Sequence, residues 1–123
     1  EAGLNFAISY KKEIDFIGKE SLLKIKNKKQ ERRFIMLSLK NGSPGQPLLL
    51  HEEPIYLDDK IIGRTTSGNY SFNFKKNLSF GYINSKYSNL ELMKMNLYIV
   101  VAKKKYQAVV EITPLKDKQA RYL

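Results

Sequence analysis

The sequence contains no cysteine, which excludes disulfide bonds, iron–sulfur clusters, thiolate zinc sites and a catalytic thiol. It has a single histidine, His51, so neither a multi-histidine metal site nor a two-histidine acid–base pair can form. The longest purely apolar run, from Leu97 to Ala102, is far shorter than the ~20 residues that cross a bilayer. We therefore expect a protein of a reducing, cytoplasmic compartment, with no metal site and no membrane partner.

Other catalytic patterns are missing as well. Glu52 and Glu53 are adjacent, and in an extended segment their side chains point to opposite faces, so they do not form a paired-carboxylate site. The segment from Gly63 to Gly68 lies between expected strands rather than before a helix, so it does not predict dinucleotide binding. We expect His51 to be a surface residue in a loop, and we predict no catalytic residue in this chain.

The length of 123 residues fits one compact domain. The chain starts with Glu1 rather than methionine and shows no signal-peptide pattern, so we expect it to be an excerpt of a longer polypeptide. We predict that residues 1–31 are a linker strand and amphipathic helix from a preceding domain, and that residues 32–123 are a β-barrel domain.

The hydrophobic pattern predicts a mainly β fold. Residues 4–10 alternate as a half-buried strand does, and Asp15 can cap a helix over 18–29, the only helix that we predict. Residues 32–39 are apolar on both faces, which is typical of a deeply buried strand, and 40–47 form a loop. Further strands are expected at 54–57, 61–67, 78–84, 97–103 and 106–113, with a hairpin around Lys103–Lys105. This spacing predicts a small closed antiparallel barrel, Greek-key or jelly-roll-like, preceded by a strand and one short α-helix.

A polar segment, "GRTTSGNYS", follows the turn at residues 58–60. Gly63 and Gly68 permit a positive φ or a close backbone approach, while the Thr, Ser and Asn side chains supply donors and acceptors. Tyr70, Phe72 and Phe74 alternate, so their rings share one face if the strand continues. The segment is either a ligand-facing corner or a barrel-closing turn whose rings fill the core, and both can hold together.

The order of four phrases resembles the C-terminal part of the glycine-cleavage T-protein (aminomethyltransferase) superfamily. They are "DFIGKESLL", "RRFIMLSL", "EEPIYLDDKIIGRTTSGNYS" and "KKNLSFGYI". The phrases "EAGLNF" and "PLLLHEEPIY" look closer to the folate-domain tails of dimethylglycine and sarcosine dehydrogenases. The resemblance implies tetrahydrofolate held in a cavity shared with preceding domains, one-carbon transfer to it, and FAD in a separate N-terminal domain of the dehydrogenase members. It also implies that the catalytic Asp and the main pterin-contacting acid lie upstream of Glu1.

The resemblance assigns Thr66, Ser67 and Gly68 to the family motif that faces the folate cavity or a neighbouring lobe. Arg64 stands at a variable position, and from charge alone Arg64 or Arg121 can pair with the glutamate tail of folate. With the neighbouring Tyr70, these are the cofactor-binding residues that we predict.

Two other functions stay open. The formal charge of +10, from 22 Lys and Arg against 12 Asp and Glu, allows a nucleic-acid-binding barrel, although the lysines are scattered rather than clustered. A purely architectural domain that buttresses its neighbours is the second alternative. Preceding domains of the same polypeptide and folate are the partners that we expect, and nucleic acid is less favoured.

Overall fold

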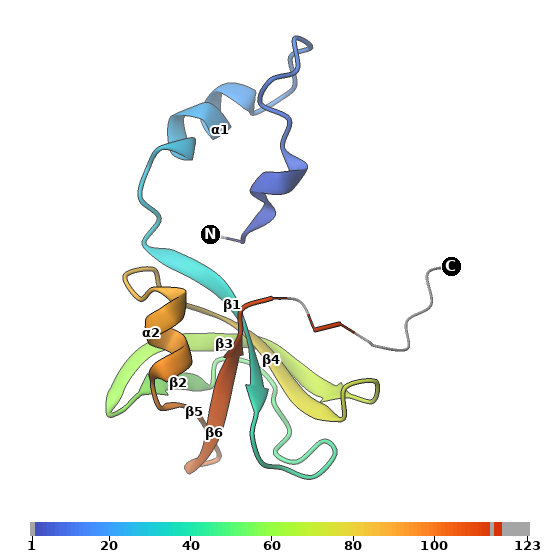
Figure 1. Cartoon of the computed structure of the whole chain (residues 1–123), viewed down its shortest axis with the longest axis vertical. Coiled ribbons are helices and arrows are strands. Elements are labelled where there is room, and N and C mark those ends of the chain that lie inside the picture. The colour runs from blue at the N-terminus through green and yellow to red at the C-terminus, as the bar shows by residue number, and fades with distance from the viewer. Residues whose placement is uncertain (1, 114, 117–123) are drawn as a thin grey trace.

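Six antiparallel strands close into a barrel in the order β1-β4-β3-β2-β5-β6. The computed structural model describes residues 2–113, 115 and 116 (Figure 1). The elements in chain order are a 3-10 helix η1 (Leu4–Ala7), α1 (Lys19–Lys26), β1 (Arg32–Leu39), β2 (Pro54–Leu57), β3 (Lys60–Ser71), β4 (Lys76–Asn84), α2 (Asn89–Lys94), β5 (Leu97–Val101) and β6 (Lys104–Glu111). Strands β2, β3 and β4 follow one another through tight connections, and β4 ends this meander beside β1, which is a Greek-key arrangement. The predicted closed antiparallel barrel is confirmed.

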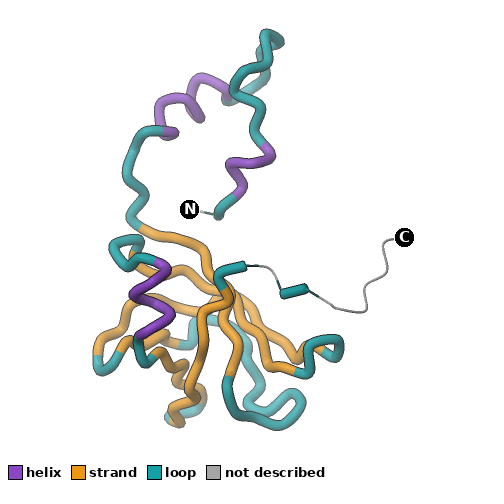
Figure 2. The backbone as a smooth tube through the Cα atoms, in the orientation of Figure 1, coloured by secondary structure: helices purple, strands orange, loops and turns teal. Residues whose placement is uncertain are grey.

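The core fills the inside of the barrel. Alternate residues of β4 point inward, and side chains such as Leu37, Ile55 and Ile99 are completely buried. β1 pairs with β4 on one side and with β6 on the other, which joins the first strand to the last. Figure 2 shows α2 lying against the strands, and its Leu92 is part of the core.

The two short hairpins explain part of the sequence pattern. The β2–β3 turn occupies Asp58 and Asp59, as predicted. In the β5–β6 hairpin the turn residues are Ala102 and Lys103, both with positive φ (47° and 65°), which suits the twist of the flanking strands. Lys104 and Lys105 already belong to β6, so the hairpin is confirmed but its turn lies slightly earlier than the lysine run.

Residues 2–31, which we call the N-terminal arm, differ from the prediction. No arm side chain is buried; the arm arches away from the barrel at the start of β1, and its first residues, Ala2 and Gly3, come back to the barrel surface (Figure 1). The strand predicted at 4–10 is wrong: Leu4–Ala7 is a 3-10 helix, and no strand of the described residues pairs with it. The predicted helix exists as α1, but Gly18 rather than Asp15 is its N-cap, and the Asp15 carboxylate accepts from the Phe16 N–H instead.

Two further expectations are corrected within the barrel region. A second helix, α2, exists, and it begins with a capping box in which Ser88 accepts from the Glu91 N–H and Glu91 accepts from the Ser88 N–H. Phe72 and Phe74 lie in the turn after β3, so the three rings do not share a strand face, and Tyr70 meets Phe72 edge-on. No helix of the described residues is long and apolar enough to cross a membrane.

Candidate functional site

A cleft of about 470 Å³ opens where β1 begins, β4 ends and β3 bends. Its walls combine the backbone of β3 with charged and amide side chains from four separate segments of the chain. The residues with polar side chains that line it are Glu31, Arg32, Glu52, Arg64, Thr65, Thr66, Tyr82 and Asn84. The sequence-predicted Arg64 and Thr66 therefore share one concave surface.

The cleft owes its shape to a β-bulge in β3. Thr65 pairs with Gly81 and Ser67 pairs with Phe80, so Thr66 has no partner across the strand pair and its side chain is exposed. At Gly63, an added Cβ would lie 2.0 Å from the Tyr82 carbonyl oxygen, which keeps β3 and β4 in close contact here. The predicted close backbone approach is confirmed for Gly63, whose φ is not positive.

The loop before β2 is clamped to the floor of the cleft by Thr65, whose side chain is fully buried. The Thr65 hydroxyl donates to the Glu53 carboxylate and accepts from the Glu53 N–H at 3.0 Å. The other Glu53 oxygen accepts from the Leu50 N–H at 2.9 Å. Glu52 adopts a positive φ of 63°, so the segment is not extended as expected. The two carboxylates nevertheless point in different directions: that of Glu53 binds Thr65, and that of Glu52 is exposed beside Arg64.

Arg64 makes a loose ion pair with Glu52, with 3.4 Å between its Nη1 and Oε2 of the carboxylate. Their side chains are 64% and 65% exposed, so the pair contributes only ~0–1 kcal/mol to stability. Arg32, at the opposite wall, holds its guanidinium over the Tyr82 ring at 5.4 Å. The cleft can therefore present an arginine fork to a carboxylate at little cost, because water already competes for the Glu52 contact.

Three other predicted residues, Ser67, Gly68 and Tyr70, do not line the cleft. The Ser67 carbonyl accepts from the Ser79 hydroxyl at 3.0 Å, and a Cβ at Gly68 would lie 2.5 Å from Leu49 Cβ. Tyr70 packs against Phe72, farther along β3. Arg121 lies outside the described residues. Sequence reasoning missed Glu31, Arg32 and Asn84 as lining residues, and no local motif marks them.

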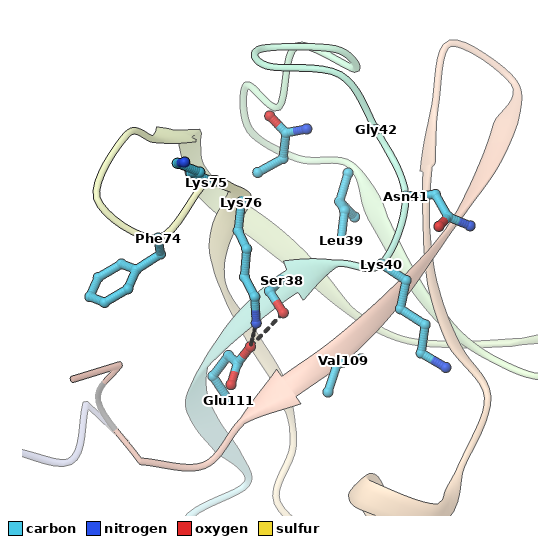
Figure 3. Close-up of a pocket in the computed structure, with 11 residues that line it drawn as sticks. Ser38, Leu39, Lys40, Asn41, Gly42, Phe74, Lys75, Lys76, Val109 and Glu111 are labelled. Carbon is cyan, nitrogen blue, oxygen red and sulfur yellow. Dashed lines mark hydrogen bonds and ion pairs between the residues drawn. The ribbon is translucent and has the colours of Figure 1, made fainter. Parts of the chain in front are cut away.

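A second hollow, of about 550 Å³, lies at the end of the β1–β6 seam. Figure 3 shows Ser38 and Lys76 converging on Glu111 from neighbouring strands, while Lys40 points away from them. Ser38 and Lys76 both donate to Glu111 Oε1, the lysine at 3.0 Å. Partial burial raises the pKa of Glu111, but the hydrogen bonds from Ser38 and Lys76 together outweigh it and the pKa is lowered. These three side chains therefore link neighbouring strands of the barrel, and the Lys76 ammonium is already paired with Glu111.

Comparison with known proteins assigns the fold to a family. Residues 32–117 match the family model of the glycine cleavage T-protein C-terminal barrel domain. The chain belongs to this family. The segment that carries Thr66, Ser67 and Gly68 lies within the matched residues, so the resemblance inferred from the sequence phrases is confirmed.

The relatives of this chain include aminomethyltransferases and dimethylglycine dehydrogenases. The chain is 38% identical over 115 residues to an aminomethyltransferase of Listeria welshimeri, covering 93% of this chain and 30% of that protein. It is 34% identical over 115 residues to the human mitochondrial dimethylglycine dehydrogenase, covering 94% of this chain and 13% of that protein. The chain thus spans less than a third of the length of these curated relatives.

A crystal structure of glycine cleavage system aminomethyltransferase T from Bartonella henselae has the same fold. The TM-score is 0.60 at 19% sequence identity, covering 80% of this chain and 26% of that one. The barrel described above is therefore the T-protein C-terminal barrel, and its relatives are longer proteins in which it is the C-terminal domain.

Proposed function

We propose that this T-protein barrel forms one wall of a tetrahydrofolate cavity in a one-carbon-transfer enzyme whose catalytic residues lie in preceding domains. The observation that supports this proposal is the cleft at the β3 bulge, which brings Arg64 and Thr66 together in the family's motif region. When bound, tetrahydrofolate supplies the one-carbon acceptor. The domain's residues orient the cofactor; they do not carry out the transfer.

Within this cleft, Arg64 is the residue that we assign to the glutamate tail of folate. A guanidinium–carboxylate contact is charge-assisted and contributes ~1.5–3 kcal/mol when partly desolvated. Glu52 already forms an ion pair with the Arg64 guanidinium, so a folate carboxylate competes with Glu52 for this guanidinium. Thr66 lines the same cleft and offers a hydroxyl to the ligand. Ser67, Gly68 and Tyr70 do not line the cleft, and we assign them an indirect role through the conformation of β3.

The test is a tetrahydrofolate titration of the complete polypeptide with Arg64→Gln and, as a charge-matched control, Lys104→Gln on β6. We expect the dissociation constant of the Arg64 variant to rise about 10- to 150-fold, the range that ~1.5–3 kcal/mol implies. The variant and the parent should bind a pteroate analogue without the glutamate tail equally well. Glu52→Gln should tighten tetrahydrofolate binding, because it removes the competing carboxylate. Equal affinity of the Arg64 variant and the control would contradict the assignment.

The similarity to dimethylglycine dehydrogenase motivates a finer proposal, that an FAD domain precedes this barrel in the complete polypeptide. We assign the complete polypeptide to the cytoplasm on the basis of the sequence alone. Absorbance near the flavin bands of the complete polypeptide tests the first point. An architectural role, in which the barrel buttresses the preceding domains, is the alternative to folate contact. That role predicts a lower melting temperature on deletion of the barrel, with unchanged ligand affinity.

A nucleic-acid role has weaker support. The Tyr56 and Tyr98 rings stack on each other with centroids 5.2 Å apart, and Lys105 lies over Tyr98 at 4.6 Å. These rings are therefore partly covered rather than presented as an open stacking platform. Binding of single-stranded RNA that persists at low salt and falls steeply with added salt would revive this alternative.

A further inference from the structure

The outer surface of the barrel carries an apolar groove that the folate proposal does not use. The groove has a volume of about 530 Å³ and lies over β1, β4 and β6. Phe34 and Phe80 stack in it with ring centroids 5.2 Å apart and planes 9° from parallel. They are 37% and 38% exposed, and Ile112 beside them is 37% exposed.

The strand pattern shows why this surface is unusual. In β1 the alternation that directs Ile35 and Leu37 into the core leaves Phe34 and Met36 on the outer face, next to Phe80 of β4. The outward positions of an antiparallel barrel strand in water are ordinarily polar. β1 is apolar on both faces, as the sequence indicated, but only one of these faces is covered by the barrel itself. A contiguous exposed apolar surface of this kind marks an interaction site.

The groove is continuous with the N-terminal arm. Ala2 and Gly3 line the groove together with Phe34 and Phe80, and the beginning of the chain lies near β1 in Figure 1. The next residues of the arm expose further large apolar side chains, Leu4 at 59% and Phe6 at 87%. The groove and the arm residues that follow its Ala2 and Gly3 edge thus both expose apolar side chains within the described part of the chain.

We propose that this groove and the adjoining arm dock an apolar surface of the preceding domains of the same polypeptide. The length of the relatives supports this occupant, since the aligned chain spans 30% of the Listeria protein and the matched family model is a C-terminal domain. Any polypeptide that leads into Ala2 reaches the barrel at the mouth of the groove. The inference rests on the proposed function only in taking those domains to be present; it does not depend on folate.

Photo-cross-linking of the complete polypeptide tests this docking. Phe80 is replaced by the photo-reactive p-benzoylphenylalanine, and the same replacement at Phe72, which is 81% exposed in the β3–β4 turn, serves as the matched control. A second probe at Ile112 guards against a local packing defect at Phe80. Irradiation is followed by denaturing electrophoresis and mapping of the joined peptides by mass spectrometry.

We expect the probes at positions 80 and 112 to join peptides upstream of residue 1 within one chain, at a yield at least tenfold above that of the probe at 72. Cross-links that join two chains would assign the groove to a second copy and overturn the proposal. Yields at 80 and 112 that do not exceed the control would show an open groove and would overturn it too. The cross-linking is done without folate, so its result does not depend on the folate proposal. If the probes join upstream peptides but the Arg64 variant keeps its tetrahydrofolate affinity, only the folate proposal is refuted.

Discussion

The barrel and the N-terminal arm are stabilised in different ways. The barrel buries thirteen hydrophobic side chains in one cluster, whereas the arm buries none, and Ile17 of the arm is fully exposed. Both regions contain many Leu, Ile and Phe residues, so composition does not explain the difference. The difference is that strands β1 to β6 supply hydrogen-bonding and packing partners to one another, while most of the arm's large apolar side chains are exposed.

The two helices repeat this contrast on a small scale. α1 is the longer helix, but it begins at Gly18 without a side-chain cap and buries no residue. α2 spans six residues, but it has a complete capping box and buries Leu92. Short helices in water are marginal without such contacts, so tertiary contact rather than length stabilises α2.

The largest effect that we expect comes from a pair of matched leucine truncations. Leu37→Ala in the barrel removes a fully buried side chain and should lower the free energy of unfolding by ~2–5 kcal/mol. Leu23→Ala in the arm removes a side chain that is 45% exposed and should change it by less than ~0.5 kcal/mol. Urea unfolding of the 123-residue chain, followed by circular dichroism, measures both. A similar loss for the two variants would mean that the arm belongs to the cooperative core.

A smaller effect separates two neighbouring threonines within the barrel. Thr65→Val removes the buried hydroxyl that donates to Glu53 Oε2 and accepts from the Glu53 N–H, leaving the carboxylate with only the Leu50 N–H as donor, which should cost ~1–3 kcal/mol. Thr66→Val, at the exposed bulge, should be nearly neutral for stability. Thermal melts of both variants at neutral pH give the comparison. Equal melting temperatures would argue against the Thr65–Glu53 clamp.

The smallest effect concerns the pH dependence of the barrel seam. Because the pKa of Glu111 is lowered in the folded state below the ordinary value of 4.5, its contribution is present above that value and is lost as the pH falls through the lowered pKa. Glu111→Gln should remove about 1 kcal/mol at neutral pH and make stability less dependent on pH below the ordinary carboxyl pKa of 4.5.

Glu20→Gln is the matched change in the arm. The Glu20 contact with Lys24 joins two highly exposed side chains, so this variant should leave unfolding unchanged. Denaturant titrations at a series of pH values distinguish the two variants. An unaltered pH profile for Glu111→Gln would show that the seam cluster adds nothing to acid stability.

Much of the fold was predictable from local patterns. Short apolar segments separated by turn residues indicated all six strands, and the family phrases indicated the T-protein barrel. α2 was missed although Ser88 and Glu91 form a capping-box spacing, because its six residues carry little hydrophobic periodicity. The strand expected at residues 4–10 was wrong, since an alternating pattern specifies a strand only where another strand can pair with it.

The candidate site was predictable only in part. Arg64 and Thr66 line the cleft, but Ser67, Gly68 and Tyr70 of the same segment point to other neighbours. One skipped residue in the pairing of β3 with β4 causes this separation, because every position after a bulge changes its relation to the partner strand. Glu31 and Asn84 enter the cleft from distant parts of the chain, so no local motif could identify them.

The amino-acid order alone determined that this chain forms a small antiparallel barrel of the T-protein type, because strand periodicity and turn residues are local properties that each segment carries with it. Only the tertiary structure decided which polar side chains meet in the cleft and which apolar side chains of β1 remain uncovered. Both outcomes depend on strand register and barrel closure, which arise when segments far apart in the sequence pair with one another.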